Sequence, residues 1–220
     1  MAIKASEVNK LRQQTGAGMM DCKNALVETN GDFEAAVDVL RKKGQKVAAK
    51  RGDNDAREGI IIAQSSTDSK AGVIVTLNCE TDFVAKNDGY VQLVQSLVDL
   101  ALDKQPKSLD ELKTLAYNEK LSVTEKITEQ IGVLGEKLDL SAYTLVESNQ
   151  VVAYNHPGNQ LATLVALNSA SDIAEDAGKQ VAMQVAAMNP MAVSKDGIDS
   201  KTIEREIEVG KDQAIQEGKP

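Results

Sequence analysis

An internal repeat constrains this fold more than any other feature of the sequence. Two β-branched runs, residues 60–62 and 73–77, flank a polar stretch and predict a β-hairpin. A helix is expected after Phe83, because apolar residues between Val94 and Ala101 recur at helical spacing. The predicted unit is therefore strand, strand, helix.

The same order of elements returns 90 residues later. Strands are expected at 151–154 and 161–167, with a turn at 155–159 between them and a helix through Met188 after them. Phe83 aligns with Ile173. We interpret the match as an internal duplication, the alternative being a chance similarity of two hairpins. The offset aligns four identities: Val75 with Val165, Leu77 with Leu167, Asn78 with Asn168 and Asp82 with Asp172.

Residues 6–43, before the repeat, are predicted to form three short helices, since apolar residues recur at helical spacing in each. Asp32 is the expected N-cap of the third helix. The apolar stripe of the second helix is expected to be Met19, Cys22 and Leu26. So small a bundle buries little surface by itself, and the polar residues 44–58 are expected to link it to the rest.

Further helices are expected at 108–118, 122–135 and 200–216. The last of these helices has a narrow apolar seam, and a seam so narrow needs a second helix to pack against. That second helix either comes from another molecule, giving a homodimer, or belongs to a segment that is missing because the chain is cut short. The seam residues are Ile203, Ile207, Gly210 and Ala214.

The composition limits the partners and the compartment. A net charge of −8 disfavours direct nucleic-acid binding, because neutralising phosphates requires a basic surface. No apolar run approaches the roughly 20 residues that a membrane-spanning helix needs. Cys22 and Cys79 are isolated thiols and no secretory signal opens the sequence, so we expect a soluble protein of the cytoplasm.

Few residues could carry catalysis. His156 is the only histidine, so a histidine-rich metal site is excluded and a catalytic triad has only this residue to use. A thiol site made of Cys79, Asp82 and His156 is the enzymatic alternative, but Cys79 ends an apolar strand and is expected to be buried. We therefore expect no enzyme, no catalytic residue, no metal and no cofactor.

Three unusual features remain, each with a plain structural alternative. Adjacent Met19 and Met20 cannot both face one core, so one is expected at the surface, unless both only pack inside. Phe83 stands next to Asp82 just past a strand end, where it is either exposed for a partner or a core anchor. His156 lies at the tip of a hairpin turn, where it contacts a partner or is simply solvated.

Two segments carry a resemblance to a known family. Residues 15–23, TGAGMMDCK, and residues 78–86, NCETDFVAK, are similar to the two signature motifs of the bacterial elongation factor Ts family. The resemblance covers essentially the whole chain, including residues 217–220. Residues 135–140 match only loosely a stretch that is more basic in some members.

The resemblance implies an α+β fold in four parts. Residues 1–52 resemble a ubiquitin-associated-like (UBA-like) three-helix domain. Residues 53–140 and 141–192 resemble two duplicated core subdomains, the second incomplete, and 193–220 resemble the first arm of a helical hairpin. Family members continue with a returning helix, a further core strand and a C-terminal module, so the resemblance implies a chain truncated at its C-terminus.

The family exchanges guanine nucleotide on elongation factor Tu, so the resemblance implies binding to the GDP-bound and nucleotide-free forms of that partner during translation elongation. Asp82 and Phe83 correspond to the pair that inserts beside the partner's magnesium site. His156 corresponds to a histidine that helps displace the partner's phosphate-binding loop. The alternative function is a tether that binds a partner without remodelling it. The contacts on the GTPase domain correspond to Arg12, Met19 and Met20, and the motif around the inserting pair includes Thr81, Val84, Ala85 and Lys86.

Overall fold

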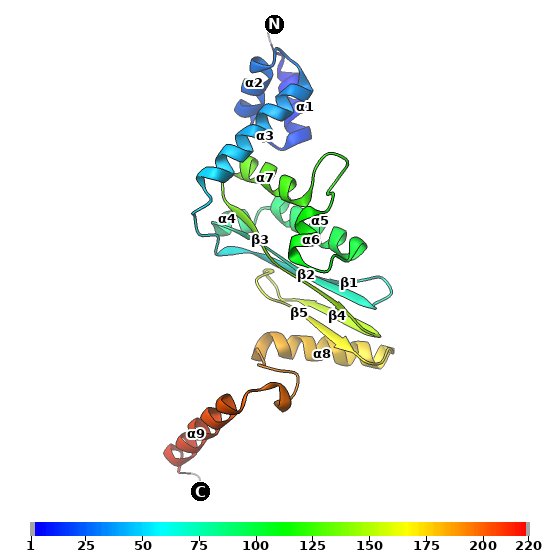
Figure 1. Ribbon diagram of the computed structural model, residues 1–220, viewed down its shortest axis with the longest axis vertical. Coiled ribbons are helices and arrows are strands. Elements are labelled where there is room, and N and C mark those ends of the chain that lie inside the picture. The colour runs from blue at the N-terminus through cyan, green and yellow to red at the C-terminus, as the bar shows by residue number, and fades with distance from the viewer. Residues whose placement is uncertain (1–2, 219–220) are drawn as a thin grey trace. The chain divides into compact units, whose positions relative to one another are not determined.

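The computed structural model describes residues 3–218 of the chain (Figure 1). It contains helices and small antiparallel sheets, so the expected α+β class is confirmed. By the contacts among its Cα atoms, the chain divides into two compact units, Met1–Met183 and Gln184–Pro220.

Three helices open the first unit, as their apolar spacing predicts: α1 (Ala5–Thr15), α2 (Met19–Glu28) and α3 (Phe33–Lys50). Gly16 ends α1 with a left-handed φ of 72°, a conformation that strains residues with a Cβ. Asp32 caps α3 by accepting a hydrogen bond from the Ala35 N–H, as expected. The small core between the helices is centred on the fully buried Leu11 and Leu26.

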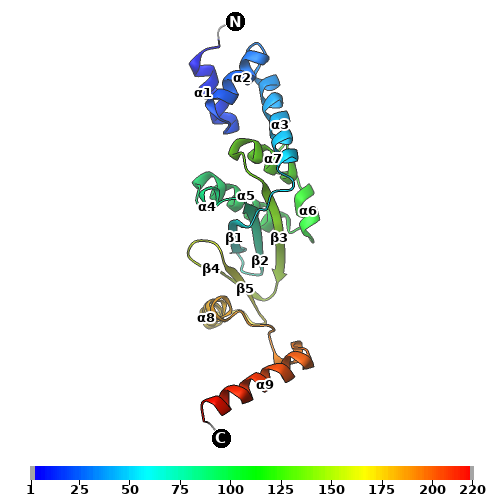
Figure 2. The same ribbon diagram turned by 90° about the vertical axis from the view of Figure 1, so that its left-hand side faces the viewer.

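Helix α3 continues to Lys50, so the expectation that residues 44–58 form a linker is wrong for 44–50. This stretch is helical because it packs on α7 (Val123–Leu134). A Cβ added at Gly132 would lie 2.6 Å from the Cα of Gly44. Two glycines therefore let the two backbones touch, and α3 joins the bundle to the main core (Figure 2).

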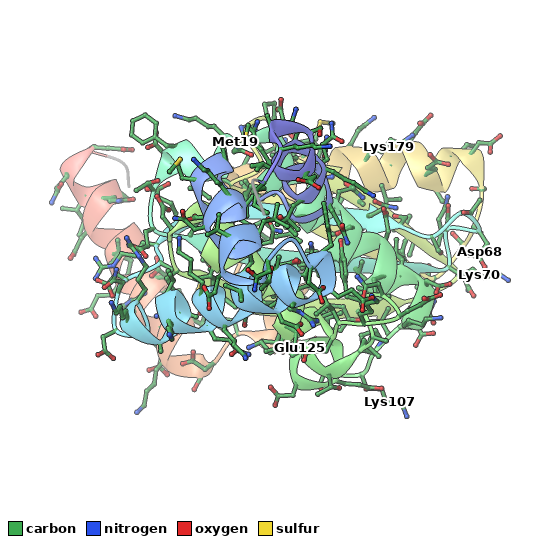
Figure 3. The ribbon with its side chains drawn as sticks, turned by 90° about the horizontal axis from the view of Figure 1, so that it is seen from above. Met19, Asp68, Lys70, Lys107, Glu125 and Lys179 are labelled. Atoms are coloured by element: carbon green, nitrogen blue, oxygen red, sulfur yellow. The ribbon has the colours of Figure 1, made fainter. Side chains whose placement is uncertain are left out.

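Within the described residues of this unit, five strands form two antiparallel sheets: β1 (Glu58–Ser65), β2 (Ala71–Cys79), β3 (Leu138–Glu147), β4 (Gln150–Asn155) and β5 (Ala162–Leu167). In the first sheet β2 lies between β1 and β3, and β4 pairs with β5 in the second. Asp68 and Lys70 mark the tip of the β1–β2 hairpin (Figure 3). Strand β3 was not predicted, although the alternation of buried Leu138 and Leu140 with exposed Asp139 and Ser141 is a strand signal.

Three helices follow β2 before α7: α4 (Asp82–Ala85), α5 (Asp88–Lys104) and α6 (Leu109–Thr114). The face of α5 from Val94 to Ala101 is buried against the sheet, as predicted. The helix expected at 108–118 is shorter, because Ala116 instead forms a β-bridge with Ser122. Helix α7 begins with a capping box, in which Ser122 and Glu125 bond each other's backbone N–H.

The two hairpins share one register, which supports a duplication over a chance similarity. Ile62 pairs with Val75 in the first hairpin, and Val152 pairs with Val165 in the second, a shift of 90 residues on both strands. Helix α8 (Asp172–Met188) follows the second hairpin, as α4 and α5 follow the first. The predicted strand-strand-helix order is therefore present twice.

The second unit contains a short 3-10 helix, η1 (Lys195–Gly197), and helix α9 (Ser200–Gln216). The bounds of α9 are those predicted. Its seam residues Ile203 and Ile207 are exposed in the chain by itself.

We expect Gly132→Ala to destabilise the first unit by about 1–3 kcal/mol, because the new methyl group would meet the backbone of α3 and overpack the crossing. Chemical denaturation of both proteins measures the change. Gly210→Ala is the matched control, since nothing lies within 4 Å of the added Cβ in α9. The control is expected to be neutral or stabilising by about 0.5–1 kcal/mol, and equal losses for both variants would contradict the crossing argument.

Candidate functional site

A single helical turn presents Phe83 to solvent beyond the central strand of the first sheet. Strand β2 ends at Cys79, and α4 begins at Asp82. Val84 and Ala85 turn back and pack against the main core, whereas Phe83 is 83% exposed. Of the two sequence-based alternatives for Phe83, the core anchor is wrong.

Asp82 adds a negative charge beside this ring. Its Oδ2 accepts a hydrogen bond of 2.7 Å from the Nζ of Lys86, one helical turn along. That bond and the lysine charge hold the pKa of Asp82 below its ordinary value, so the group is a carboxylate at neutral pH. The Asp82 side chain is 47% exposed, and an ion pair in solvent contributes little to stability. The turn therefore offers an apolar ring and an accessible carboxylate together.

Glu80 anchors the same turn to the end of α3. Its carboxylate accepts hydrogen bonds from the Arg51 Nη1 at 2.9 and 2.8 Å and from the Asn54 Nδ2 at 3.0 Å. The backbone N–H of Lys137 donates to it as well. The Lys137 hydrogen bond is the largest of the causes that hold the pKa of Glu80 below its ordinary value.

Thr81 is held by a second carboxylate, that of Glu136, which accepts from both its backbone N–H and its hydroxyl. Sequence reasoning missed Glu80 and Glu136 as site residues. Glu80 lies inside the NCETDFVAK segment, which was a usable signal. Glu136 lies 55 residues away in the loosely matching segment 135–140, and only the fold brings it to Thr81.

The helical bundle carries a second group of candidate residues. Met19 and Met20, the first two residues of α2, are 45% and 63% exposed, so both are at the surface (Figure 3 labels Met19). The expectation that Met19 belongs to a stripe with Cys22 is wrong, because α2 turns Cys22, Ala25 and Leu26 inward instead. Arg12 is exposed near the end of α1.

His156 lies at the turn between β4 and β5 and is exposed. The Tyr154 hydroxyl lies 3.0 Å from its Nδ1. The side chain of Asn155 makes two hydrogen bonds with the backbone of Ala63 in β1, accepting from the N–H and donating to the carbonyl, each at 2.8 Å. The Ile61 N–H also donates to the Asn159 carbonyl at 2.7 Å. The turn that carries His156 is thus tied to the edge of the first sheet.

These candidates occupy three separate places: the turn after β2, the helical bundle and the β4–β5 turn. Within residues 3–218 no hydrogen bond or ion pair links one group directly to another. Nor does this part of the chain contain a cluster of His, Cys, Asp or Glu side chains that could hold a metal ion. The arrangement suits contact with a large surface more than chemistry at one point.

The thiol-enzyme alternative finds no support in the geometry. Cys79 is fully buried, and its Sγ donates to the Thr81 carbonyl at 3.1 Å. Burial raises the pKa of this thiol, which disfavours the nucleophilic thiolate. His156 is instead paired with Tyr154.

The family model described as "Elongation factor TS" matches residues 80–220. The elongation factor Ts of Christiangramia forsetii is 52% identical over 218 residues, which cover 99% of this chain and 78% of that protein. That of Amoebophilus asiaticus is 51% identical over 223 residues, covering 100% of this chain and 79% of its own length.

The chain belongs to the elongation factor Ts family. The resemblance inferred from the two sequence motifs is therefore confirmed, and the protein is a factor of translation elongation. The part matched by the elongation factor Ts model contains both the Asp82–Phe83 turn and His156. Arg12, Met19 and Met20 precede that part but lie in the region shared with the relatives. None of the described helices is long and apolar enough to cross a membrane.

We expect Glu80→Gln to lower the melting temperature at neutral pH, because it removes the charge that Arg51 and Lys137 contact. The folded-state pKa of Glu80 lies below its ordinary value of 4.5, so its contribution is complete above that value and is lost as the pH falls through the folded pKa. The difference in melting temperature between wild type and variant should therefore stay constant from about pH 7 to about pH 5 and shrink as the pH falls further.

Thermal unfolding followed by circular dichroism across this pH range provides the measurement. Glu119→Gln serves as control, since Glu119 is exposed and makes no hydrogen bond within the described chain. A gap between wild type and Glu80→Gln that stays constant below about pH 5 as well would contradict the assignment.

Proposed function

We propose that this chain binds elongation factor Tu and promotes the release of its GDP, acting as its guanine-nucleotide exchange factor in the cytoplasm. Membership of the elongation factor Ts family implies a nucleotide-exchange role in translation elongation. The observation that carries the proposal is Phe83, 83% exposed beside the charged Asp82 on an anchored turn. Leaving a large apolar side chain in water costs free energy, and burial against a partner would offset that cost.

Exchange is a coupling between two binding sites. The factor must bind nucleotide-free elongation factor Tu better than the GDP-bound form, and the coupling is reciprocal. Each tenfold weakening of GDP binding requires about 1.4 kcal/mol of such preference. Burying one phenylalanine side chain contributes roughly 1.5–3 kcal/mol, which corresponds to about one to two decades. Phe83 inserting beside the partner's magnesium site is therefore one contributor among several.

In this proposal the other candidate groups supply the remaining preference for nucleotide-free elongation factor Tu. His156 displaces the phosphate-binding loop of elongation factor Tu, and its turn is held against β1 by Asn155. Met19, Met20 and Arg12 dock the bundle on the GTPase domain. Methionine side chains adapt to an irregular surface, which suits a docking contact. The Gly44–Gly132 crossing holds the bundle on the core, so docking can set the position of the inserting turn.

Charge and the last helix bear on further partners. A net charge of −8 supports a protein partner over direct binding of nucleic acid. Ile203 and Ile207 are exposed on α9, so we propose that two chains associate through this helix. The molecular mass in solution would distinguish a dimer from a monomer. The UBA-like character of the bundle and the four-part domain division are likewise proposals.

The release of labelled GDP from elongation factor Tu tests the function. We expect this 220-residue chain to accelerate release, with the elongation factor Ts of Christiangramia forsetii measured beside it as a longer reference. Co-purification with elongation factor Tu without acceleration would favour the tether. No binding at all would refute both.

Replacing Phe83 by Ala is expected to slow stimulated GDP release by about one to two decades, because the ring's burial is lost, while binding is retained. The variant should fold normally, since the ring packs against no core.

Ile173→Ala is the matched control for that experiment. Ile173 occupies the equivalent position of the second copy and is also 83% exposed. We expect it to leave release within about twofold of wild type, because an exposed side chain outside the contact contributes almost nothing. Equal effects of the two substitutions on GDP release would contradict a specific role of Phe83.

Joint replacement of Met19 and Met20 by Ala is expected to weaken binding to elongation factor Tu by about one decade. At saturating factor the rate of GDP release should change little, because docking and insertion are separate contacts. Titration calorimetry for binding and release at saturation give the two quantities. A lower saturating rate with unchanged affinity would argue against a docking role.

A further inference from the structure

Thr81 donates both of its hydrogens to a single carboxylate. Its backbone N–H lies 3.0 Å from Oε2 of Glu136, and its hydroxyl lies 2.7 Å from Oε1. Both groups are partly buried, and hydrogen bonds to a charged acceptor are stronger than those between neutral groups. Two bonds to one rigid carboxylate fix the position of Thr81 and also its orientation.

This arrangement is not the default for a strand leading into a helix in this fold. At the equivalent junction of the second copy, the Ser171 hydroxyl accepts a hydrogen bond of 3.1 Å from the Ala174 N–H and so caps its own helix. The Thr81 side chain makes no capping bond to α4. The Thr81 hydroxyl thus donates to Glu136 and does not cap the helix that carries Phe83.

Residues 135–137 connect this junction to the rest of the first unit. Gly135 ends α7 in a left-handed conformation, with φ 74°. Lys137 then donates its backbone N–H to Glu80 and its Nζ to the carbonyls of Gly52 and Asn54, at 2.7 and 2.8 Å. Lys137 therefore holds both the end of β2 and the segment after α3.

Burial alone would hold the turn loosely. Within α4 only Ala85 is buried, and Phe83 faces solvent. Loops with few buried contacts sample many orientations. The bonds of Glu80 to Arg51 and Lys137 hold the end of β2, and the two bonds from Thr81 to Glu136 act on the residue directly before Asp82 and Phe83.

We propose that Glu136 is a positioning residue for nucleotide exchange, which by holding Thr81 sets the direction in which Phe83 leaves the sheet. This inference rests on the proposed function. In this proposal Glu136 acts through Thr81 and not by contact with the partner. Its contribution is preorganisation, because a ring already aimed at its target loses less freedom on insertion.

The experiment is a double-mutant cycle on the 220-residue chain, read as the rate of labelled GDP release from elongation factor Tu. Glu136→Gln keeps the size of the side chain but turns one of its two acceptors into a donor, and we expect a loss of about tenfold. In a Phe83→Ala background the same substitution should change the rate by less than about twofold. Glu119→Gln is the matched control and should leave release unchanged.

Two variants at Thr81 keep the test independent of folding. Thr81→Ser retains both donors and should match wild type, whereas Thr81→Val keeps only the N–H and should show part of the loss. Amide hydrogen exchange gives a direct readout, because the Thr81 amide should exchange faster in Glu136→Gln while the amide of Val75 in the sheet stays protected.

The outcomes separate the two proposals. Unchanged release by Glu136→Gln, or a loss that persists in the Phe83→Ala background, overturns the positioning role and leaves the proposed function standing. The second result would mean that Glu136 acts on stability rather than through the ring. If the wild-type chain fails to accelerate release, the proposed function falls and the positioning role falls with it.

Discussion

The burial of β2 is the constraint on which the rest of the first unit depends. Its side chains Val73, Val75, Leu77 and Cys79 are all removed from water, and β1 and β3 satisfy its backbone on both edges. Each buried aliphatic side chain contributes roughly 1.5–3 kcal/mol, so the strand is firmly held near the candidate site. The Tyr90 hydroxyl adds a hydrogen bond of 2.6 Å to the Leu77 carbonyl. A rigid strand end provides the platform from which an exposed residue can be presented.

Duplication explains the scaffold, and the two copies differ in how the helix after the hairpin begins. The hairpins keep the same register, yet α4 and α5 are separate helices in the first copy and α8 is continuous in the second. In the first copy the Asn87 side chain caps α5 by accepting from the Gly89 and Tyr90 N–H groups. The equivalent residue is Ala177, which has no acceptor, so no new helix start is imposed there.

Much of this architecture could be predicted from periodicity and capping. The hairpins, the buried face of α5 and the bounds of α9 follow from local patterns, because apolar spacing reports which face is buried. The second half of α3 and the whole of β3 could not be predicted in the same way. Residues 44–50 contain a glycine and too few apolar residues to show a helical stripe, and they extend α3 where Gly44 meets Gly132; β3 is stabilised by pairing with β2. In both cases the decisive partner lies at least 59 residues away.

For the candidate site, the sequence by itself determined the residue types that matter: an aromatic ring beside an acid after a strand, two methionines at a helix start and a histidine in a turn. It also determined the family, since the two motifs are local strings of residues. Only the tertiary structure decided that Phe83 and both methionines face solvent, and that Cys79 is buried beneath the turn. It alone brought Glu136 to Thr81 and Asn155 to Ala63. The physical reason is that exposure and hydrogen bonding depend on which distant segments pack together, and a local pattern does not contain that information.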